Sequence, residues 1–196
     1  MTDMEKSKYT FTTEQIEQEL KRVRYKERYG RTLRSTIYAL ITVAAVAILI
    51  AVLLLPVFQI YGHSMTPTLE DGDIVLSIKN ASVESQDIIA FYYNNKILVK
   101  RVIAEAGQWV DIDKAGNVRV DGVLLNEPYL TDKARGECDI KMPYQVPEGK
   151  VFVMGDHRSV SVDSRTLAIG CVSEEQIVGK LVMRVWPLEN IEKIEE

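Results

Sequence analysis

Residues 35–62 read STIYALITVAAVAILIAVLLLPVFQIYG, and these 28 residues contain no charged side chain. A helix needs roughly 20 predominantly apolar residues to cross the hydrocarbon core of a bilayer, and this run exceeds that length. The alternative is a helix buried in a globular core, which seldom keeps so long an uncharged stretch. We therefore predict one transmembrane helix over residues 35–58.

The flank before this run is strongly basic: residues 21–34 hold seven basic side chains and one acidic side chain. Basic flanks favour the cytoplasmic side of a membrane, which predicts a cytoplasmic segment at residues 1–34. The run lies too far along the chain, and is too long, for a cleaved secretory signal. We interpret it as a permanent single-pass anchor in the cell membrane that leaves residues 59–196 outside the cytoplasm.

A second helix is expected within the basic segment. Ile16, Leu20 and Val23 recur at helical spacing, and Thr12 or Thr13 is placed to cap the first turn. Basic side chains on such a helix also attract anionic lipid, so a juxtamembrane helix and a lipid-bound helix are compatible interpretations.

The chain beyond the anchor changes to short β-like segments separated by turn formers such as AGN, DG and PEGK. This pattern predicts a mainly β fold, with an antiparallel β domain over residues 59–196. Residues 131–146 are polar and poorly patterned, so we expect a surface insertion there. The predicted strands cover residues 73–78, 87–93, 96–104, 109–113, 118–125, 150–155 and 177–187.

Net charge and cysteine spacing give no support for a nucleic-acid, zinc or redox function. The chain of 196 residues carries a net charge of −4, which offers no general reason to expect a nucleic-acid partner. Cys138 and Cys171 lie in the external part, where oxidation is possible. Their spacing fits no zinc or redox motif, so a disulfide and two free thiols both remain open. We predict no metal and no cofactor.

Ser64 lies within GHSMTPTLEDGDIVL, residues 62–76, among turn formers and a proline. No G-x-S-x-G elbow surrounds it, and the chain holds only two histidines, His63 and His157, to serve as the usual base. An extended backbone would point His63 away from its neighbour Ser64. If Ser64 is a nucleophile, its base is therefore another type of residue.

Lys100 and Arg101 stand side by side in the strand-like segment ILVKRVIA, residues 97–104. Alternation sends them to opposite faces, both otherwise apolar, so at least one of the two cations is expected in a poorly solvated place. Only lysine can respond by losing its proton. Burial lowers a lysine pKa, which makes Lys100 a candidate general base, with a snorkelling surface lysine as the alternative.

Three segments together favour the catalytic interpretation. The chain carries GHSMTPTLEDGDIVL, then ILVKRVIAEAG, then VFVMGDHRSVSVDSR, behind an N-terminal anchor. This order resembles type I signal peptidase, the membrane-bound serine protease that removes signal peptides from exported proteins. The resemblance runs over residues 37–187 and includes NEPYL and PEGKVFVMGD. It implies a Gram-positive-like form with a β catalytic domain of the signal-peptidase type behind one anchor.

The resemblance also implies roles for individual residues. Ser64 would be the nucleophile and Lys100 the general base, so no histidine is required. Ser161 would orient the Lys100 amine by a hydrogen bond. Asp163 and Arg165 would hold the GDHRSVSVDSR loop against the catalytic strand.

The same resemblance implies substrates and partners. Preprotein signal peptides with small residues at positions −1 and −3, the Ala-x-Ala pattern, would enter shallow apolar pockets. The exposed surface near the site would contact the outer face of the bilayer, and contact with the secretion machinery is compatible with this task. The residues implied to line the pockets are Phe58, Ile60, Met65 and Val99.

The chain departs from the family pattern at two places, and at a third, Gly62, it matches only part of the family. Gly62 stands where some members add a hydroxyl to the oxyanion site, so the backbone N–H of Ser64 is the expected donor and a second donor stays open. His157 replaces the usual asparagine of G-D-N-R, which adds a titratable ring and a source of pH sensitivity. AEAG at residues 104–107 replaces the usual G-L-P-G and alters a turn.

Two competing functions are considered. A non-catalytic, membrane-tethered assembly factor of the same fold, as in pilus biogenesis, would be expected to lack the serine or the lysine, and both are present. A self-cleaving repressor-type Ser–Lys peptidase would carry a DNA-binding domain rather than a membrane anchor. The presence of both the serine and the lysine, together with the membrane anchor, favours signal peptidase over these two alternatives.

Overall fold

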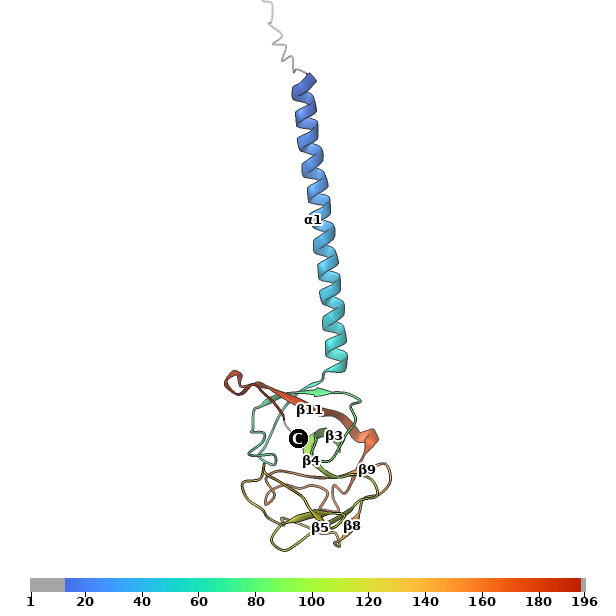
Figure 1. Cartoon of the computed structure of the whole chain (residues 1–196), viewed down its shortest axis with the longest axis vertical. Helices are drawn as coiled ribbons and strands as arrows, with labels where there is room; N and C mark the ends of the chain where they lie inside the picture. Colours follow the sequence, from blue (N-terminus) through green and yellow to red (C-terminus); the bar gives the residue numbers. More distant parts are fainter. Residues whose placement is uncertain (1–12, 195–196) are drawn as a thin grey trace, which may run out of the picture. The chain divides into compact units, whose positions relative to one another are not determined.

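The computed structural model describes residues 13–194, and the chain separates into a helical unit up to Ala51 and a β unit from Val52 onwards. One helix, α1 (Thr13–Leu54), occupies the first part of the described chain (Figure 1). It combines the helix expected in the basic segment and most of the predicted span in one continuous element. The helix ends two residues before Pro56, whose ring disfavours helical geometry in the residue before it. Thr12, a proposed cap, lies outside the described residues.

The helix α1 buries none of its residues and contains an apolar window long enough to cross a membrane. Its uncharged part, Ser35–Leu54, has 20 residues. At about 1.5 Å per residue this part is about 30 Å long, which matches the hydrocarbon thickness of a bilayer. The helix therefore provides a single membrane anchor.

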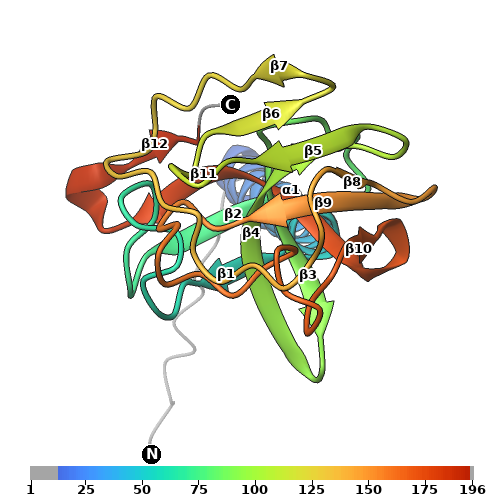
Figure 2. The same ribbon diagram turned by 90° about the horizontal axis from the view of Figure 1, so that it is seen from below.

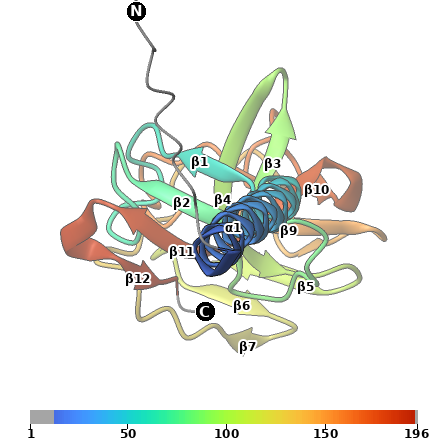
Figure 3. The same cartoon turned by 90° about the horizontal axis from the view of Figure 1, so that it is seen from above.

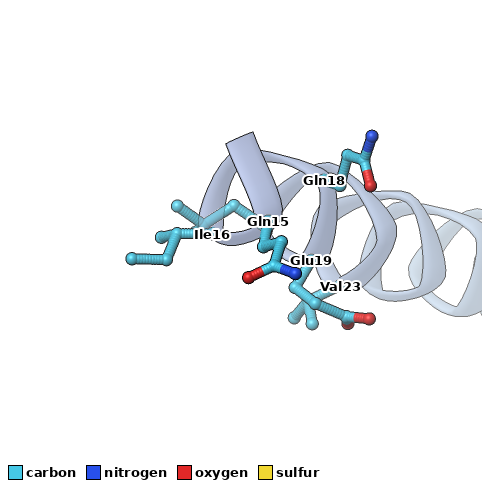
Figure 4. Close-up of a pocket in the computed structure, with 6 residues that line it drawn as sticks. Gln15, Ile16, Gln18, Glu19 and Val23 are labelled. Atoms are coloured by element: carbon cyan, nitrogen blue, oxygen red, sulfur yellow. The ribbon is translucent and has the colours of Figure 1, made fainter. Parts of the chain in front are cut away.

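The first turns of α1 carry a shallow hollow on one face (Figure 4). Ile16 and Val23 line it together with Leu20, and each of these three side chains is about half exposed. The polar residues beside them are glutamine and glutamate, which bring no catalytic group together. This hollow belongs to the helical unit and contains none of the residues expected in the active site.

The β unit is built from two antiparallel sheets, as the sequence predicted. Within the described chain, the larger sheet has the strand order β1-β2-β11-β3-β4-β9-β10, with β12 paired to β11, and the smaller sheet has the order β7-β6-β5-β8. Every predicted strand segment contains at least one strand, and the four missed strands are only two or three residues long. The strands are β1 (Val57–Gln59), β2 (Ile74–Ile78), β3 (Ile88–Tyr93), β4 (Lys96–Ala104), β5 (Trp109–Ile112), β6 (Val118–Val120), β7 (Val123–Leu124), β8 (Tyr144–Gln145), β9 (Lys150–Met154), β10 (Val172–Ser173), β11 (Ile177–Trp186) and β12 (Glu192–Lys193). Two short 3₁₀ helices, Glu174–Gln176 and Leu188–Asn190, flank β11.

The strands β3 and β4 form the centre of the larger sheet. Ile88–Phe91 of β3 are buried on both faces, as expected for a central strand rich in β-branched and aromatic residues. Their partner β4 is buried from Lys100 to Ala104 but exposed at its start. The exposed half forms a hairpin with the end of β3 that extends beyond the neighbouring strands (Figures 2 and 3). The sheet is therefore well packed where Lys100 lies and open just before it.

Three apolar clusters hold the unit together. One joins the smaller sheet to the end of β4 and to β9 through residues such as Ile103, Val110 and Phe152. A second packs Met65 and Leu69, from the loop between β1 and β2, against the larger sheet. The third lies on β3, β4 and β9. The second cluster anchors the segment that carries Ser64.

Candidate active site

Ser64 lies in the loop that joins β1 to β2. Backbone hydrogen bonds from Ile60 N–H to the Asp73 carbonyl, 2.8 Å, and from Gly72 N–H to the Ile60 carbonyl, 2.9 Å, close the two ends of the loop. Gly62 has a φ of +86°, a backbone conformation that residues with a Cβ rarely adopt. With Met65 buried beneath it, the loop presents Ser64 in a defined place.

Lys100 reaches Ser64 from β4, where it pairs with Ile89 of β3. Its Nζ is hydrogen-bonded to Ser64 Oγ at 2.5 Å, and the lysine is only 4% exposed. Burial, opposed by the charge of Asp163, lowers the pKa of Lys100 from 10.5 to about 8. About a tenth of the amine is then neutral at pH 7, and the neutral amine can accept a proton.

Arg101, the neighbour of Lys100, is also buried, so both adjacent cations lie in poorly solvated places. Its guanidinium donates two hydrogen bonds to the carboxylate of Asp156, at 3.0 and 2.8 Å. Arg101 also stacks on the ring of Tyr129, 3.8 Å from the ring centroid. Unlike Lys100, this arginine is fully paired and remains charged.

The buried charges around Ser64 and Lys100 form arginine–carboxylate pairs that do not include Lys100. Arg101 pairs with Asp156, Arg158 with Glu127 and Arg165 with Asp163. Across residues 13–194, Lys100 forms no ion pair within 4.0 Å. Although these carboxylates are paired with arginines, the charges of Asp163 and Asp156 still raise the pKa of Lys100, and the larger effect of burial lowers it.

The predicted supporting residues lie in the loop that follows β9. Asp163 accepts a hydrogen bond from Gly155 N–H at 2.9 Å, and its two oxygens accept bonds of 2.8 Å from Arg165. Arg165 also donates to the Ser161 carbonyl at 3.2 Å. These bonds close the loop on itself at full burial, rather than tying it directly to β4.

Gly155 shows how tightly this loop approaches Ser64. A Cβ at that position would lie 2.2 Å from Ser161 Oγ and 2.4 Å from the Ser64 carbonyl oxygen. Only glycine fits such a contact. The Ser161 hydroxyl is buried and has no hydrogen-bond partner among the described residues, so the expected bond to Lys100 is not formed in this structure. Its role stays a prediction.

A small pocket of about 110 Å³ opens beside Ser64 and Lys100. Ser64 and Lys100 lie on its wall, and all four residues implied by sequence as substrate contacts line it, together with neighbours from β1 and β4. The four are Phe58, Ile60, Met65 and Val99.

A second, wider pocket of about 680 Å³ also includes Ser64 and Lys100. Leu98, Val160 and Ile169 contribute to its largely apolar wall. Both histidines of the chain line this wider pocket.

Some residues around the site were not identified from the sequence. The pairing of Glu127 with Arg158, at 2.5 Å, was missed because the segment NEPYL was noted only as family-like. The partner of Asp156 was also missed, since it is Arg101 on β4, far from this loop in the sequence. The adjacent position of Lys100 and Arg101 was the available signal that Arg101 would need a buried acid.

Comparison with known proteins identifies the family of the chain. The family model "Signal peptidase, peptidase S26" matches residues 33–186. Signal peptidase IB of Staphylococcus aureus is 37% identical over 153 residues, which cover 68% of this chain and 78% of that protein. The chloroplastic thylakoidal processing peptidase 1 of Arabidopsis thaliana is 32% identical over 170 residues, 78% of this chain and 48% of that protein. A crystal structure of a signal peptidase I from Enterococcus faecalis aligns with 29% identity over 52% of this chain and 97% of the other, with a TM-score of 0.45.

An anchored antiparallel β unit that is similar in sequence to these enzymes defines a serine peptidase. The chain belongs to the signal peptidase family, peptidase S26. Its function is that of a signal peptidase, as the sequence motifs predicted, and no observation favours the non-catalytic assembly factor.

Proposed function

We propose that Ser64 is the nucleophile and Lys100 the general base of this signal peptidase. The observation that carries the proposal is the 2.5 Å hydrogen bond between Lys100 Nζ and Ser64 Oγ, made by a buried lysine whose pKa is lowered to about 8. Neither histidine ring is hydrogen-bonded to Ser64 Oγ in the described structure. A lysine near its pKa is suited to take and return a proton.

The reaction proceeds by acyl transfer. Ser64 Oγ forms a bond to the scissile carbonyl carbon while its proton moves to the neutral amine of Lys100. The resulting ammonium gives this proton to the leaving amine as the C–N bond breaks, which leaves an ester on Ser64. Lys100 then takes a proton from water, the hydroxide oxygen bonds to the ester carbon, and the proton returns to Ser64 as the signal peptide leaves.

The oxyanion requires a hydrogen-bond donor near Ser64. The backbone N–H of Ser64 donates to no described residue, so it is free for this task. A preorganised donor of this kind stabilises the transition state more than the bound substrate. Gly62 offers no side-chain donor, and the second donor is left unassigned.

The substrate enters as an extended strand. Within the described sheet, β1 pairs only with β2, and residues 96–100 of β4 pair only with β3. Both free edges line the 110 Å³ pocket, and an added strand would find backbone donors and acceptors there. This arrangement brings a peptide carbonyl to Ser64.

The size of the pocket favours small side chains. Phe58, Ile60, Met65 and Val99 line this pocket of about 110 Å³, so alanine-sized residues at positions −1 and −3 fit best. Each additional methylene would cost about 1–3 kcal/mol in transition-state binding. The Ala-x-Ala pattern follows from exclusion of larger residues.

The membrane orientation follows from charge. The basic flank of α1 keeps residues 1–34 in the cytoplasm, the helix crosses the bilayer within residues 35–58, and the β unit lies outside. Val57 and Met183, neighbours of Leu76 across the sheet, are exposed apolar side chains that would contact lipid. Preproteins emerging from the secretion machinery would then meet the enzyme at the membrane.

The test is cleavage of a preprotein with an Ala-x-Ala site by the full-length protein in detergent or lipid. We expect cleavage by the parent and none above background by Ser64→Ala, Lys100→Met or Lys100→Arg. The arginine variant keeps the charge but cannot accept a proton, so it separates base catalysis from simple electrostatic stabilisation. Unfolding temperatures identify any variant that fails to fold.

Cleavage by folded Lys100→Arg at neutral pH would contradict the assignment of the base. A parent that cleaves none of several preproteins, although folded, would favour the tethered assembly factor instead. A scrambled Ala-x-Ala site provides the substrate control.

A further inference from the structure

His157 contacts the backbone on both sides of the nucleophile. Its backbone N–H donates to the Ser64 carbonyl at 3.1 Å. Its ring nitrogen Nδ1 lies 3.2 Å from the carbonyl oxygen of His63. Because a carbonyl can only accept, Nδ1 must carry the hydrogen of this bond. The carbonyls immediately before and after the Ser64 Cα are therefore both held by one residue.

The bond to the His63 carbonyl matters because the same peptide unit carries the Ser64 N–H. The peptide unit between His63 and Ser64 is planar, with its C=O and N–H pointing in opposite directions. Its N–H is the Ser64 donor proposed for the oxyanion. Whatever fixes the His63 carbonyl therefore fixes the direction of that N–H.

Without His157, this carbonyl would keep one weak backbone bond. The Thr66 N–H donates to it at 3.3 Å across a turn. Gly62 precedes this peptide with a φ of +86°, and glycine adopts other backbone conformations easily. The ring of His157 supplies a second, independent restraint on the same oxygen.

His157 itself is held by a rigid frame. On either side of it, Asp156 is paired with Arg101 and Arg158 with Glu127, and all four are buried. The backbone N–H of Ser161 also donates to the His157 carbonyl at 3.1 Å. The residue is therefore anchored well enough for its ring to restrain a neighbouring loop.

We propose that His157 is a positioning residue that holds the Ser64 backbone N–H toward the oxyanion through its hydrogen bond to the His63 carbonyl. The inference rests on the proposed role of Ser64 as nucleophile. It does not make His157 a base, since its ring is not bonded to Ser64 Oγ. Both the neutral Nδ1–H tautomer and the imidazolium carry the required donor.

Three substitutions separate donor position from bulk and charge. Asparagine carries its amide nitrogen on Cγ, like Nδ1 of histidine, whereas glutamine carries its amide nitrogen one carbon further out. Leucine has similar bulk but no donor. Ser159→Leu, at an exposed position two residues along the same loop, is the matched control.

The measurement is steady-state cleavage of the Ala-x-Ala preprotein by the full-length protein in detergent, with kcat and KM resolved. We expect His157→Leu and His157→Gln to lower kcat about 3- to 10-fold with little change in KM, the range for loss of one hydrogen bond of ordinary strength. His157→Asn should stay within about twofold of the parent, and so should Ser159→Leu. The pH at which the rate reaches half its maximum should be the same in all variants.

Three results would overturn the inference: a His157→Leu variant with the parent kcat, an asparagine variant as impaired as the leucine variant, or a change confined to KM. An equal loss of kcat in Ser159→Leu would also overturn it, because the effect would then come from general disturbance of the loop. Ser64→Ala in the same assay tests the nucleophile separately. A parent that does not cleave, or cleavage that survives Ser64→Ala, overturns the proposed function and the inference with it.

Discussion

Replacing Lys100 by methionine should stabilise the protein while it abolishes activity. The lysine is 4% exposed, and burial lowers its pKa from 10.5 to about 8. A shift of this size corresponds to about 3 kcal/mol of folding free energy at a pH where the amine is charged in both the folded and the unfolded chain. Methionine is unbranched and adapts to the same apolar space without that penalty.

The stabilisation should depend on pH in a defined direction. Below about pH 8 the folded parent carries a buried ammonium, and the full penalty applies. Between pH 8 and 10.5 the folded chain binds fewer protons than the unfolded chain, so the penalty shrinks as the pH rises. The advantage of Lys100→Met should therefore be largest near pH 6–7 and fall steadily above pH 8.

Loss of the hydrogen bond to Ser64 offsets about 1 kcal/mol of this gain. The net stabilisation near pH 6–7 is then about 2 kcal/mol. For a unit of this size each kcal/mol shifts the unfolding temperature by about 2–4 °C, so we expect an increase of about 4–8 °C.

Thermal unfolding of the full-length protein in detergent, followed by the fluorescence of Trp109 and Trp186 in the β unit, measures this shift at pH 6.5 and pH 9.5. Lys96→Met is the control, since Lys96 starts the same strand but is exposed to water. An unchanged or lower unfolding temperature for Lys100→Met at pH 6.5 would refute the reasoning, and so would a gain that does not shrink at pH 9.5.

Three further predictions concern activity, packing and specificity. The parent kcat/KM should rise with pH through an apparent pKa of about 8 as Lys100 loses its proton, and a profile that is flat from pH 6 to 9 would contradict this. Glu127→Gln leaves the buried guanidinium of Arg158 without its carboxylate and should lower the free energy of unfolding by about 3–5 kcal/mol. Replacing both Glu127 and Arg158 by apolar residues of similar volume should lower it less, and denaturant titration measures both variants. Val99→Ala enlarges the 110 Å³ pocket and should raise cleavage at sites with valine at position −1 or −3 by at least about 10-fold relative to alanine sites, and an unchanged preference would exclude Val99 from the pocket that selects these residues.

The membrane anchor and the β class could be predicted from the sequence because both are local signals. An uncharged run of 28 residues and a period-two alternation need no knowledge of distant contacts. The missed strands, such as β1 and β8, have too few residues for a pattern and exist only because a partner strand pairs with them. The helix was predicted as two segments but is continuous, since no residue between them breaks it.

The sequence by itself determined that Ser64 lies in a restrained turn and that Lys100 follows at the apolar end of a strand. Only the tertiary structure decided that the lysine has no carboxylate partner among residues 13–194, because its surroundings come from segments far apart in the chain. Asp156 reaches Arg101 across 55 positions, and His157 reaches the peptide before Ser64 across 94. A pKa depends on the burial and charges that surround a group in three dimensions, and the arrangement of these long-range pairs leaves Lys100 buried with a lowered pKa, as the proposed base requires.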